Sequence, residues 1–528
     1  MLITAVLVAL ATSATATPAP FLIFHVDAVS RHDFDAALAA GRLPNIEAAF
    51  TDGAYLPAVT LYFAATPVIY PRMRDPEGSG GPGRVGFGGF DRDLGRPVTE
   101  AEVFLELLEA VPRRAVTNFV HGIPGLDALA VAAMQNLPAL LERYGVIEFF
   151  WFSTDALGHL AGAQAHAASL ERFDAALGRI LPELDLERLN LILYTDHGIT
   201  FATEMVNQDA IVHERIGDQV LHFDYPNLYL HDPAQAPSAA RALATADGFD
   251  TSFYRLDATT VKGFVDGAFV RFERLGDGLR YVSAEDPLGY AALGYRGEAL
   301  DPDAWLSLTV DARFPGTPWN VWWYLDNPDT GDVVVSFTPP RIPRTTRATQ
   351  GAHAGIVDTD LSVVVLARGP DLETLMTREA IWLHELYLDA PAALERRAPA
   401  RDEHIASLSL DLASLTPAAE LRWSPAYRQR LAIALTPKAA SGWAEVDLFS
   451  TYLARWWLGG GLSLDDERGL EPLFHSDLHL DLGPAQLTLS GRALPTDWSL
   501  GVSLRIALEG GWGVRWQAPA ALGVEYRW

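Results

Sequence analysis

The chain has no cysteine among its 528 residues. Disulfide bonds, thiolate metal ligands and a cysteine nucleophile are therefore all excluded. A complete lack of cysteine is compatible with a protein of the bacterial envelope, although it does not require that location.

Positive charge is scarce. The sequence has 40 Lys and Arg residues against 67 Asp and Glu residues, which gives a formal net charge of −27. A surface that binds a nucleic-acid polymer needs Lys and Arg to offset the phosphates, so this composition argues against such a partner. It leaves open a small phosphorylated substrate, because a metal ion can supply positive charge locally.

Long apolar runs are also absent beyond the N-terminus, so we expect no transmembrane helix. The first 20 residues, "MLITAVLVALATSATATPAP", combine a short apolar core with small residues and an A-x-A pattern at Ala14–Ala16. No early Lys or Arg precedes the apolar core. We expect a signal peptide over residues 1–17 and export of the chain; the alternative is an apolar N-terminal strand.

The length predicts two or three domains. From residue 21 to about residue 200, strand and helix patterns alternate. The expected strands are 21–27, 145–155 and 190–198, and the expected helices are 32–41 and 163–184. This order predicts an α/β domain over residues 18–395 with a doubly wound, mostly parallel sheet. An aromatic, Gly- and Pro-rich stretch at 235–345 indicates a cap insertion, and 361–369 returns to the sheet.

Residues 400–528 have a different character, with short segments of period two separated by turn residues, such as "WSLGVSLRIAL" (498–508) and "LGVEYRW" (522–528). The pattern predicts an all-β antiparallel domain, either a soluble sandwich or a small outer-membrane barrel of about eight strands. We favour the barrel, because Arg505 and Glu525 would be costly in an apolar core but fit a polar lumen.

Four fragments place metal-ligand side chains at the ends of expected strands or in adjoining loops. They are Asp27 in "FLIFHVD", Asp155 and His159 in "STDALGHLAG", Asp196 and His197 in "TDHG", and His353 in "GAHAG". In a doubly wound sheet the carboxyl ends of the strands meet at one crevice, so separated fragments can come together there. Carboxylates mixed with imidazoles suit zinc or a similar divalent ion.

The four fragments, in this order, resemble the motifs of the alkaline phosphatase superfamily, and most closely those of its type I phosphodiesterase/nucleotide pyrophosphatase branch. The resemblance covers about residues 20–395 and implies a hydrolase of phosphoric esters with two divalent ions, for which we expect Zn²⁺. It implies that Asp27, Asp196 and His197 hold one ion together with the nucleophile. Asp155, His159 and His353 would hold the second.

The resemblance also implies a Thr or Ser nucleophile after the first strand–helix unit. In "GAYLPAVTLYFAATPVIYPRM" we choose Thr66, which precedes Pro67 at a plausible first helical position; Thr60 is the alternative. The metal-activated hydroxyl would form a phospho-threonine intermediate. We expect phosphodiester or nucleotide-type substrates. A phosphomonoesterase and a catalytically inactive envelope binding or surface protein are the alternatives.

Two departures from the family pattern stand out. The family usually has Gly after the first metal-binding Asp, where this chain has Ala28, and the Asn that helps to hold the phosphate cannot be placed. A sulfatase is disfavoured, since the chain has no Cys and no matching Ser in a C/S-x-P-x-R setting. We expect the C-terminal domain to insert in the outer membrane with the catalytic domain in the periplasm; a soluble periplasmic or secreted protein is the alternative.

Overall fold

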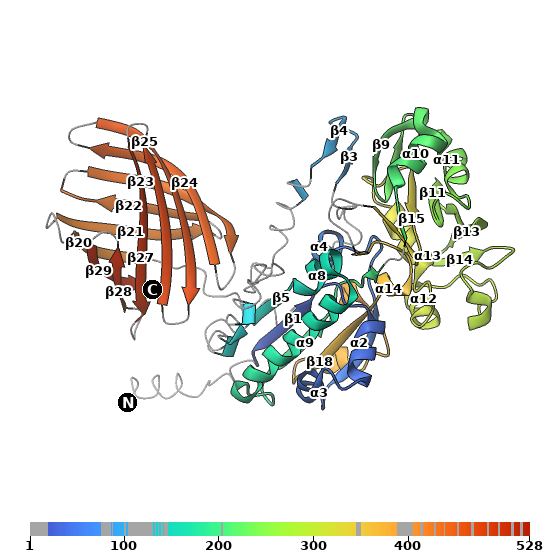
Figure 1. The fold of residues 1–528 in the computed structure, drawn as a ribbon, viewed down its shortest axis with the longest axis horizontal. Helices are drawn as coiled ribbons and strands as arrows, with labels where there is room; N and C mark the ends of the chain where they lie inside the picture. The colour runs from blue at the N-terminus through green and yellow to red at the C-terminus, as the bar shows by residue number, and fades with distance from the viewer. Residues whose placement is uncertain are drawn as a thin grey trace, which may run out of the picture.

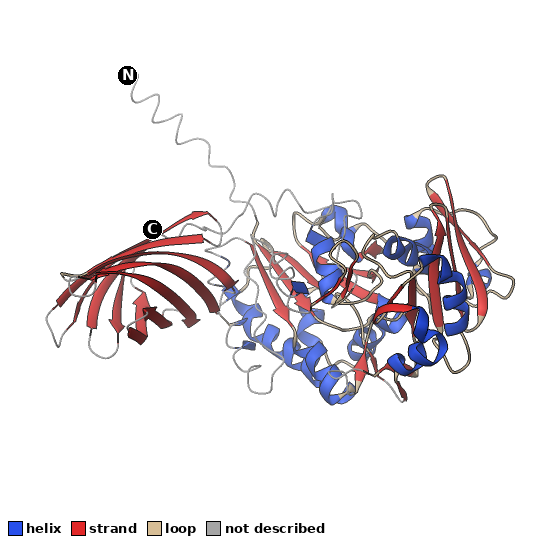
Figure 2. Cartoon of the chain, turned by 90° about the horizontal axis from the view of Figure 1, so that it is seen from above, coloured by secondary structure: helices blue, strands red, loops and turns tan. Residues whose placement is uncertain are grey.

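The computed structural model describes residues 19–74, 88–99, 146–201, 204–344 and 350–387, residues 405–527 apart from short gaps, and isolated positions between 86 and 141. The expected signal peptide over residues 1–17 lies outside the described residues. Figure 1 shows an α/β part, an antiparallel sheet beside it and a curved C-terminal sheet, which Figure 2 shows again in a view turned by 90°. Within the described residues, no helix is both long enough and apolar enough to cross a membrane.

The central sheet has six strands in the order β19-β2-β18-β6-β1-β5. Their bounds are β1 Phe21–Val26, β2 Ala54–Val59, β5 Val146–Trp151, β6 Asn190–Tyr194, β18 Ser362–Arg368 and β19 Ile381–Trp382. β1 pairs in parallel with both β5 and β6, whereas β18 runs antiparallel to β2 and β6. The predicted α/β fold with a mostly parallel sheet is confirmed, with one reversed strand.

Helices cover both faces of this sheet, because side chains alternate along each strand. On one face, Phe24 packs in a core with Phe173. On the other face, Ile23 packs in a core with Ile69. The helices of this part are α2 Arg31–Ala39, α3 Pro44–Ala49, α4 Thr66–Arg74, α8 Ser153–Ala161, α9 Ala163–Ile180, α14 Asp358–Leu361 and α15 Glu373–Met376.

A second, antiparallel sheet has the order β14-β13-β12-β11-β15-β10-β9. Its strands are β9 Val220–Asp224, β10 Asn227–Leu230, β11 Thr251–Asp257, β12 Thr260–Val265, β13 Ala268–Leu275, β14 Gly278–Val282 and β15 Val333–Ser336. Helices α10 Gln208–Ile216, α11 Ala236–Leu243, α12 Pro302–Thr309 and α13 Thr317–Leu325 accompany it. Trp319, Trp322 and Tyr324 of α13 are buried in the core that joins this sheet to Tyr62 and Phe63.

The C-terminal strands form a closed antiparallel barrel, in which β20 pairs with both β21 and β29. The strands are β20 Ile405–Asp411, β21 Thr416–Ala426, β22 Gln429–Leu435, β23 Ala439–Ser450, β24 Ala454–Asp465, β25 Gly469–Leu482, β26 Ala485–Leu494, β27 Asp497–Ala507, β28 Trp512–Gln517 and β29 Ala521–Arg527. The all-β prediction is confirmed. The barrel has ten strands where the sequence suggested about eight, because connections as short as two residues join neighbouring strands.

Candidate metal centre

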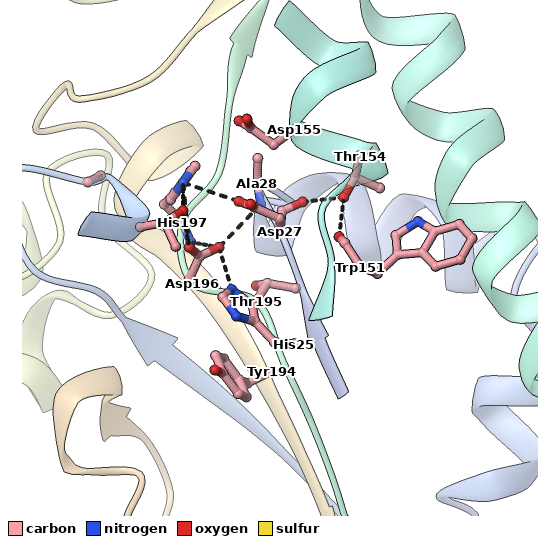
Figure 3. A network of polar contacts seen from close by, with 12 residues as sticks. His25, Asp27, Ala28, Trp151, Thr154, Asp155, Tyr194, Thr195, Asp196 and His197 are labelled. Carbon is pink, nitrogen blue, oxygen red and sulfur yellow. Dashed lines mark hydrogen bonds and ion pairs between the residues drawn. The ribbon is translucent and has the colours of Figure 1, made fainter. Parts of the chain in front are cut away.

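Three aspartates come from three neighbouring parallel strands. Asp27 directly follows β1, and Asp196 follows β6 after one residue. Asp155 lies in the first turn of α8, just after β5. Since β1 lies between β5 and β6, the three carboxylates converge at the carboxyl end of the sheet (Figure 3). All three residues are buried.

The three histidines lie beside these carboxylates, and each is positioned by a different part of the fold. His197 follows Asp196 directly, and His159 lies one helical turn after Asp155 on α8. His353 follows the short strand β17 Gly351–Ala352, which pairs antiparallel with β7 Thr200–Phe201. This pairing brings a segment from late in the chain beside the loop that follows β6.

Each of these imidazoles donates its Nδ1–H to a backbone carbonyl. The bonds run from His159 to Gly351 at 2.7 Å, from His197 to Gly198 at 2.9 Å and from His353 to Ala64 at 2.6 Å. These bonds orient each ring so that Nε2 is the nitrogen that would bind a metal ion. The Nε2 atoms face carboxylate oxygens: His159 and His353 lie 3.1 and 3.7 Å from Asp155 Oδ1, and His197 lies 3.3 Å from Asp27 Oδ1.

Asp27 is the clearest sign that a cation fits. It is fully buried, and neither carboxylate oxygen accepts a hydrogen bond within the described residues. Burial, together with the charges of Asp196 and Asp155, raises its pKa well above the ordinary value. A buried carboxylate without donors is costly unless a positive charge compensates it. The donor set of carboxylates and imidazoles suits zinc.

Two groups of potential ligand atoms gather in the described part of the chain, each within 4.8 Å. One contains Asp155, His197 and His353, and the other contains His25, Asp27 and Asp196. The resemblance divides the ligands differently, with His197 beside Asp27 and Asp196. His197 Nε2 also lies 3.6 Å from Asp196 Oδ2, so it borders both groups and either assignment is compatible with its position.

The two oxygens of Asp196 have different neighbours. Oδ1 accepts hydrogen bonds from the backbone N–H groups of Ala28 at 3.3 Å and His197 at 3.0 Å, and it lies 3.2 Å from His25 Nε2. Oδ2 accepts a hydrogen bond from Thr66 Oγ1 at 2.9 Å. Burial raises the pKa of Asp196, but the imidazoles of His197 and His25 outweigh it and bring the pKa well below its usual range.

Sequence reasoning left His25 out of the site. It lies two residues before Asp27 in β1, which places both side chains on one face of the strand. Its ring stacks on Tyr194 at 4.6 Å and tilts against Phe150 at 4.3 Å. Because His25 meets Asp196 at the oxygen that the backbone also holds, we read it as a positioning residue (Figure 3). The spacing of two residues between His25 and Asp27 was the sequence feature that could have predicted its place in the site.

The structure brings Thr66, and not Thr60, to the carboxylates. Thr66 begins α4, and its Oγ1 lies 2.9 Å from Asp196 Oδ2 and 3.4 Å from His197 Nε2. Thr60 is buried, and its hydroxyl has no hydrogen-bond partner within the described residues. The start of a helix also places the positive end of the helix dipole near the Thr66 oxygen.

Asp155, His159 and His353 form a network of opposite charges. Burial raises the pKa of Asp155, yet the nearby imidazoles of His159 and His353 outweigh it and lower the pKa to about 2. Burial lowers the pKa of His159, but Asp155 raises it to about 9. Burial and the neighbouring imidazoles of His197 and His159 lower the pKa of His353 well below its ordinary value. Asp155 therefore provides a carboxylate that two imidazoles face.

Asp360 fixes the loops around the site and was also missed. Its Oδ1 accepts a hydrogen bond from Thr200 Oγ1 at 2.7 Å, and its Oδ2 accepts one from the Gly355 N–H at 2.6 Å. It thereby joins the loop after β6 to the loop that carries His353. Burial raises its pKa to about 6. Gly198 is required beside it, since a Cβ there would lie 1.9 Å from the Thr359 carbonyl oxygen.

Ala28 occupies the position where the family pattern usually has Gly. Its φ is 54°, in the left-handed region that Gly adopts readily. Its backbone N–H is directed at Asp196 Oδ1, and its carbonyl accepts a hydrogen bond from His166 Nε2 at 2.8 Å. This chain therefore has an alanine in a left-handed conformation that favours glycine.

Residues 98–250 match the family model described as type I phosphodiesterase/nucleotide pyrophosphatase. This range contains Asp155, His159, Asp196 and His197, whereas Asp27, Thr66 and His353 lie outside it. No curated protein matches the chain significantly.

Among solved structures, murine ectonucleotide pyrophosphatase/phosphodiesterase 5 is similar at 13% identity and a TM-score of 0.44, over 72% of this chain and 96% of that chain. Phosphonoacetate hydrolase from Sinorhizobium meliloti 1021 is similar at 12% identity and a TM-score of 0.37, over 72% of this chain and 96% of that chain. Alkaline phosphatase PafA is similar at 9% identity and a TM-score of 0.42, over 73% of this chain and 97% of that chain. Over residues 98–250 the chain is therefore similar to the type I phosphodiesterases and nucleotide pyrophosphatases, and the central sheet and the four ordered motifs agree with that similarity.

Proposed function

We propose that the chain is a two-metal hydrolase of phosphoric esters that uses Thr66 as its nucleophile and favours phosphodiester or nucleotide-type substrates. The family match supports hydrolysis of phosphoric esters as the class of reaction. One observation carries the assignment of residues: the Thr66 hydroxyl lies 2.9 Å from Asp196 Oδ2 and 3.4 Å from His197 Nε2, at the edge of a buried cluster of carboxylates and imidazoles.

Two sets of side chains are suited to hold the ions. Asp27, Asp196 and His197 form the first, together with Thr66, and Asp155, His159 and His353 form the second. Bound divalent ions would supply positive charge that lowers the pKa of the threonine hydroxyl and offsets the negative charge of the phosphoryl oxygens. Zinc fits the mixed N/O donors, and the three Nδ1–H bonds keep the imidazoles oriented for it.

The protein's own residues prepare the attack. Asp196 Oδ2 accepts the hydrogen bond of the Thr66 hydroxyl, which fixes the direction of the oxygen lone pairs. In the first step the Thr66 hydroxyl gives up its proton, a bond forms between its Oγ1 and phosphorus, the bond from phosphorus to the leaving oxygen breaks, and the leaving alcohol takes up a proton. In the second step a water oxygen bonds to phosphorus, the bond to Thr66 breaks, and the hydroxyl regains its proton.

The substrate class is tested with the full-length protein, purified in detergent and supplied with zinc. Hydrolysis of bis(4-nitrophenyl) phosphate is compared with hydrolysis of 4-nitrophenyl phosphate, and Asp196→Asn serves as the blank. We expect the diester to be the better substrate by kcat/KM. A preference for the monoester would make the protein a phosphatase instead. Equal rates for the wild type and Asp196→Asn on both substrates would overturn the enzyme assignment.

A further inference from the structure

The outer face of the barrel is apolar. Among the described side chains of β21 to β28, fourteen large apolar ones are exposed: Leu421, Ile433, Leu435, Leu458, Leu462, Leu464, Leu470, Phe474, Leu489, Leu500, Val502, Ile506, Val514 and Trp516. Leu500 is 77% exposed and Phe474 is 68% exposed. Single exposed apolar residues are ordinary, but water-soluble proteins seldom carry a continuous band of them.

The inner face of the same strands is largely polar. Its buried polar residues are Arg422, Ser441, Ser463, His475, Asp477, His479, Thr488 and Ser503. Arg422 Nη1 lies 2.5 Å from Asp477 Oδ2, and the Ser441 and Ser463 hydroxyls lie 2.9 Å apart. A few apolar residues, among them Trp443 and Leu473, also lie inside. The ion pair offsets the burial of Arg422 and Asp477, and the hydrogen bond offsets that of Ser441 and Ser463.

The strand register sorts the two kinds of side chain consistently. Leu489 pairs with Val502, and both are exposed. The preceding residue Thr488 pairs with Ser503, and both are buried. The neighbouring hairpin repeats the scheme, where Ile506 pairs with Val514 on the outside. The alternation therefore follows the strand register in these neighbouring hairpins and is not a matter of scattered residues.

This arrangement is the reverse of a water-soluble sandwich, which hides its apolar face and exposes its polar one. We propose that the barrel lies in a lipid bilayer, with the fourteen apolar side chains in contact with the acyl chains. A closed barrel leaves no open strand edge within the bilayer, so its backbone hydrogen bonds are satisfied internally. Such apolar-out, polar-in barrels belong to membranes of the outer-membrane type.

The strand lengths agree with this environment. A tilted strand needs about 9–11 residues to cross the hydrocarbon layer. β21 has 11 residues, β23 and β24 have 12 each, β25 has 14, β26 has 10 and β27 has 11. The shorter strands β20, β22, β28 and β29 have 6 or 7 residues each and complete the closure.

The strand pairing also shows where the chain enters and leaves the barrel. Ile405 at the start of β20 pairs with Arg527 at the end of β29. Both ends of the described barrel strands therefore lie at the same rim, on one side of the bilayer. The apolar band is far from the metal ligands in the sequence, and the proposal stands independently of the hydrolase activity.

The absence of cysteine makes a direct test possible, because one introduced cysteine carries one label. Full-length variants Leu462→Cys and Val502→Cys on the outer face are labelled with bimane and reconstituted into phosphatidylcholine vesicles, part of whose lipids carry a doxyl quencher in the acyl chain. Leu256→Cys on β11 is the matched control, since Leu256 is 45% exposed and Leu462 is 53% exposed. Far-UV circular dichroism checks that each variant folds.

We expect both outer labels to lose most of their fluorescence in the doxyl vesicles, while the control label keeps its intensity. Ser463→Cys, on the inner face beside Leu462, should be quenched less than its neighbour. Outer labels quenched no more than the control would overturn the proposal. So would a full-length chain that remains soluble without detergent as a dimer or larger oligomer, since a second copy would then cover the apolar band.

Discussion

At the scale of single residues, Asp27 carries the strongest physical case for a bound cation. Its carboxylate is buried, accepts no hydrogen bond within the described residues and faces two further acids, Asp196 and Asp155. His197 Nε2, at 3.3 Å from its Oδ1, is the imidazole in contact with it. His197 therefore offsets the negative charge of the Asp27 carboxylate only in part, and a bound cation would offset the rest.

Asp27→Asn should have opposite effects with and without metal. In chelator the variant should unfold at a higher temperature than the wild type, because the amide has the same shape and no buried charge; we expect a gain on the order of 1 kcal/mol. With zinc the order should reverse, since the variant loses a ligand. Differential scanning fluorimetry measures both, with Asp52→Asn, whose side chain is 78% exposed, as the control. A variant less stable than the wild type in chelator would contradict the argument.

At the scale of elements, the sequence predicted the strands and helices that local patterns define. The expected strand at 21–27 is β1 Phe21–Val26, and the expected helix at 163–184 is α9 Ala163–Ile180, followed by a short 3₁₀ turn. The acids at the strand ends were predictable because parallel strands bring their carboxyl ends together. The contacts of His25 and Asp360 were not, because they depend on packing between segments far apart in the chain.

The choice between Thr66 and Thr60 shows the same limit. Both fit a spacing in the sequence, and only the position of α4 against the loop after β6 separates them. The start of α4 brings Thr66 Oγ1 to Asp196, while Thr60 is buried and its hydroxyl has no hydrogen-bond partner within the described residues. Local propensity specifies that a helix begins there, but the packing that aims its first residue is a tertiary property.

The short 3₁₀ helix Leu383–Glu385 should make stability depend on pH. The His384 ring is half-buried against the rings of Trp323 and Trp382, and this burial, with a contribution from Arg72, lowers its pKa to about 3. Between pH 6.5 and 3 the unfolded chain binds a proton there that the folded chain does not, so folding stability falls as the pH falls through this window.

His384→Gln should remove this dependence. The free energy of unfolding of the wild type relative to the variant should decrease by up to about 1.4 kcal/mol per pH unit from pH 6 down to pH 4. Urea unfolding of the full-length protein at several pH values measures it, and His213→Gln on the exposed side of α10 controls for the loss of a histidine. A difference between wild type and His384→Gln that stays constant with pH would contradict the assignment.

At the scale of the whole molecule, the metal centre and the barrel are formed by different stretches of the chain. The proposed ligands all lie between Asp27 and His353, while the barrel begins at Ile405. The sequence predicted the barrel from its period of two, but not the number of strands, since turn lengths decide how many strands a given length holds. It also could not show which polar side chains meet inside, such as Arg422 and Asp477.

Removal of metal should therefore destabilise the α/β part and leave the stability of the barrel unchanged. Chelation should lower the unfolding temperature of the α/β part, where zinc at 100 times its Kd would contribute about 2.7 kcal/mol. The barrel should keep its own transition. Scanning calorimetry in detergent resolves the two, and a gel run with unheated samples reports the folded barrel separately. Equal shifts of both transitions on chelation would show that the two parts are not independent.

The measurement that tests the central claim most directly compares two variants of the proposed nucleophile Thr66, and one variant of Thr60, on the diester substrate. With zinc present, Thr66→Ala should lose kcat by about 10³-fold or more, because no oxygen remains to attack phosphorus. Thr66→Ser should keep part of the activity, and Thr60→Ala should behave like the wild type, since its hydroxyl has no partner within the described residues. Near-normal turnover by Thr66→Ala, or a severe loss in Thr60→Ala alone, would contradict the account.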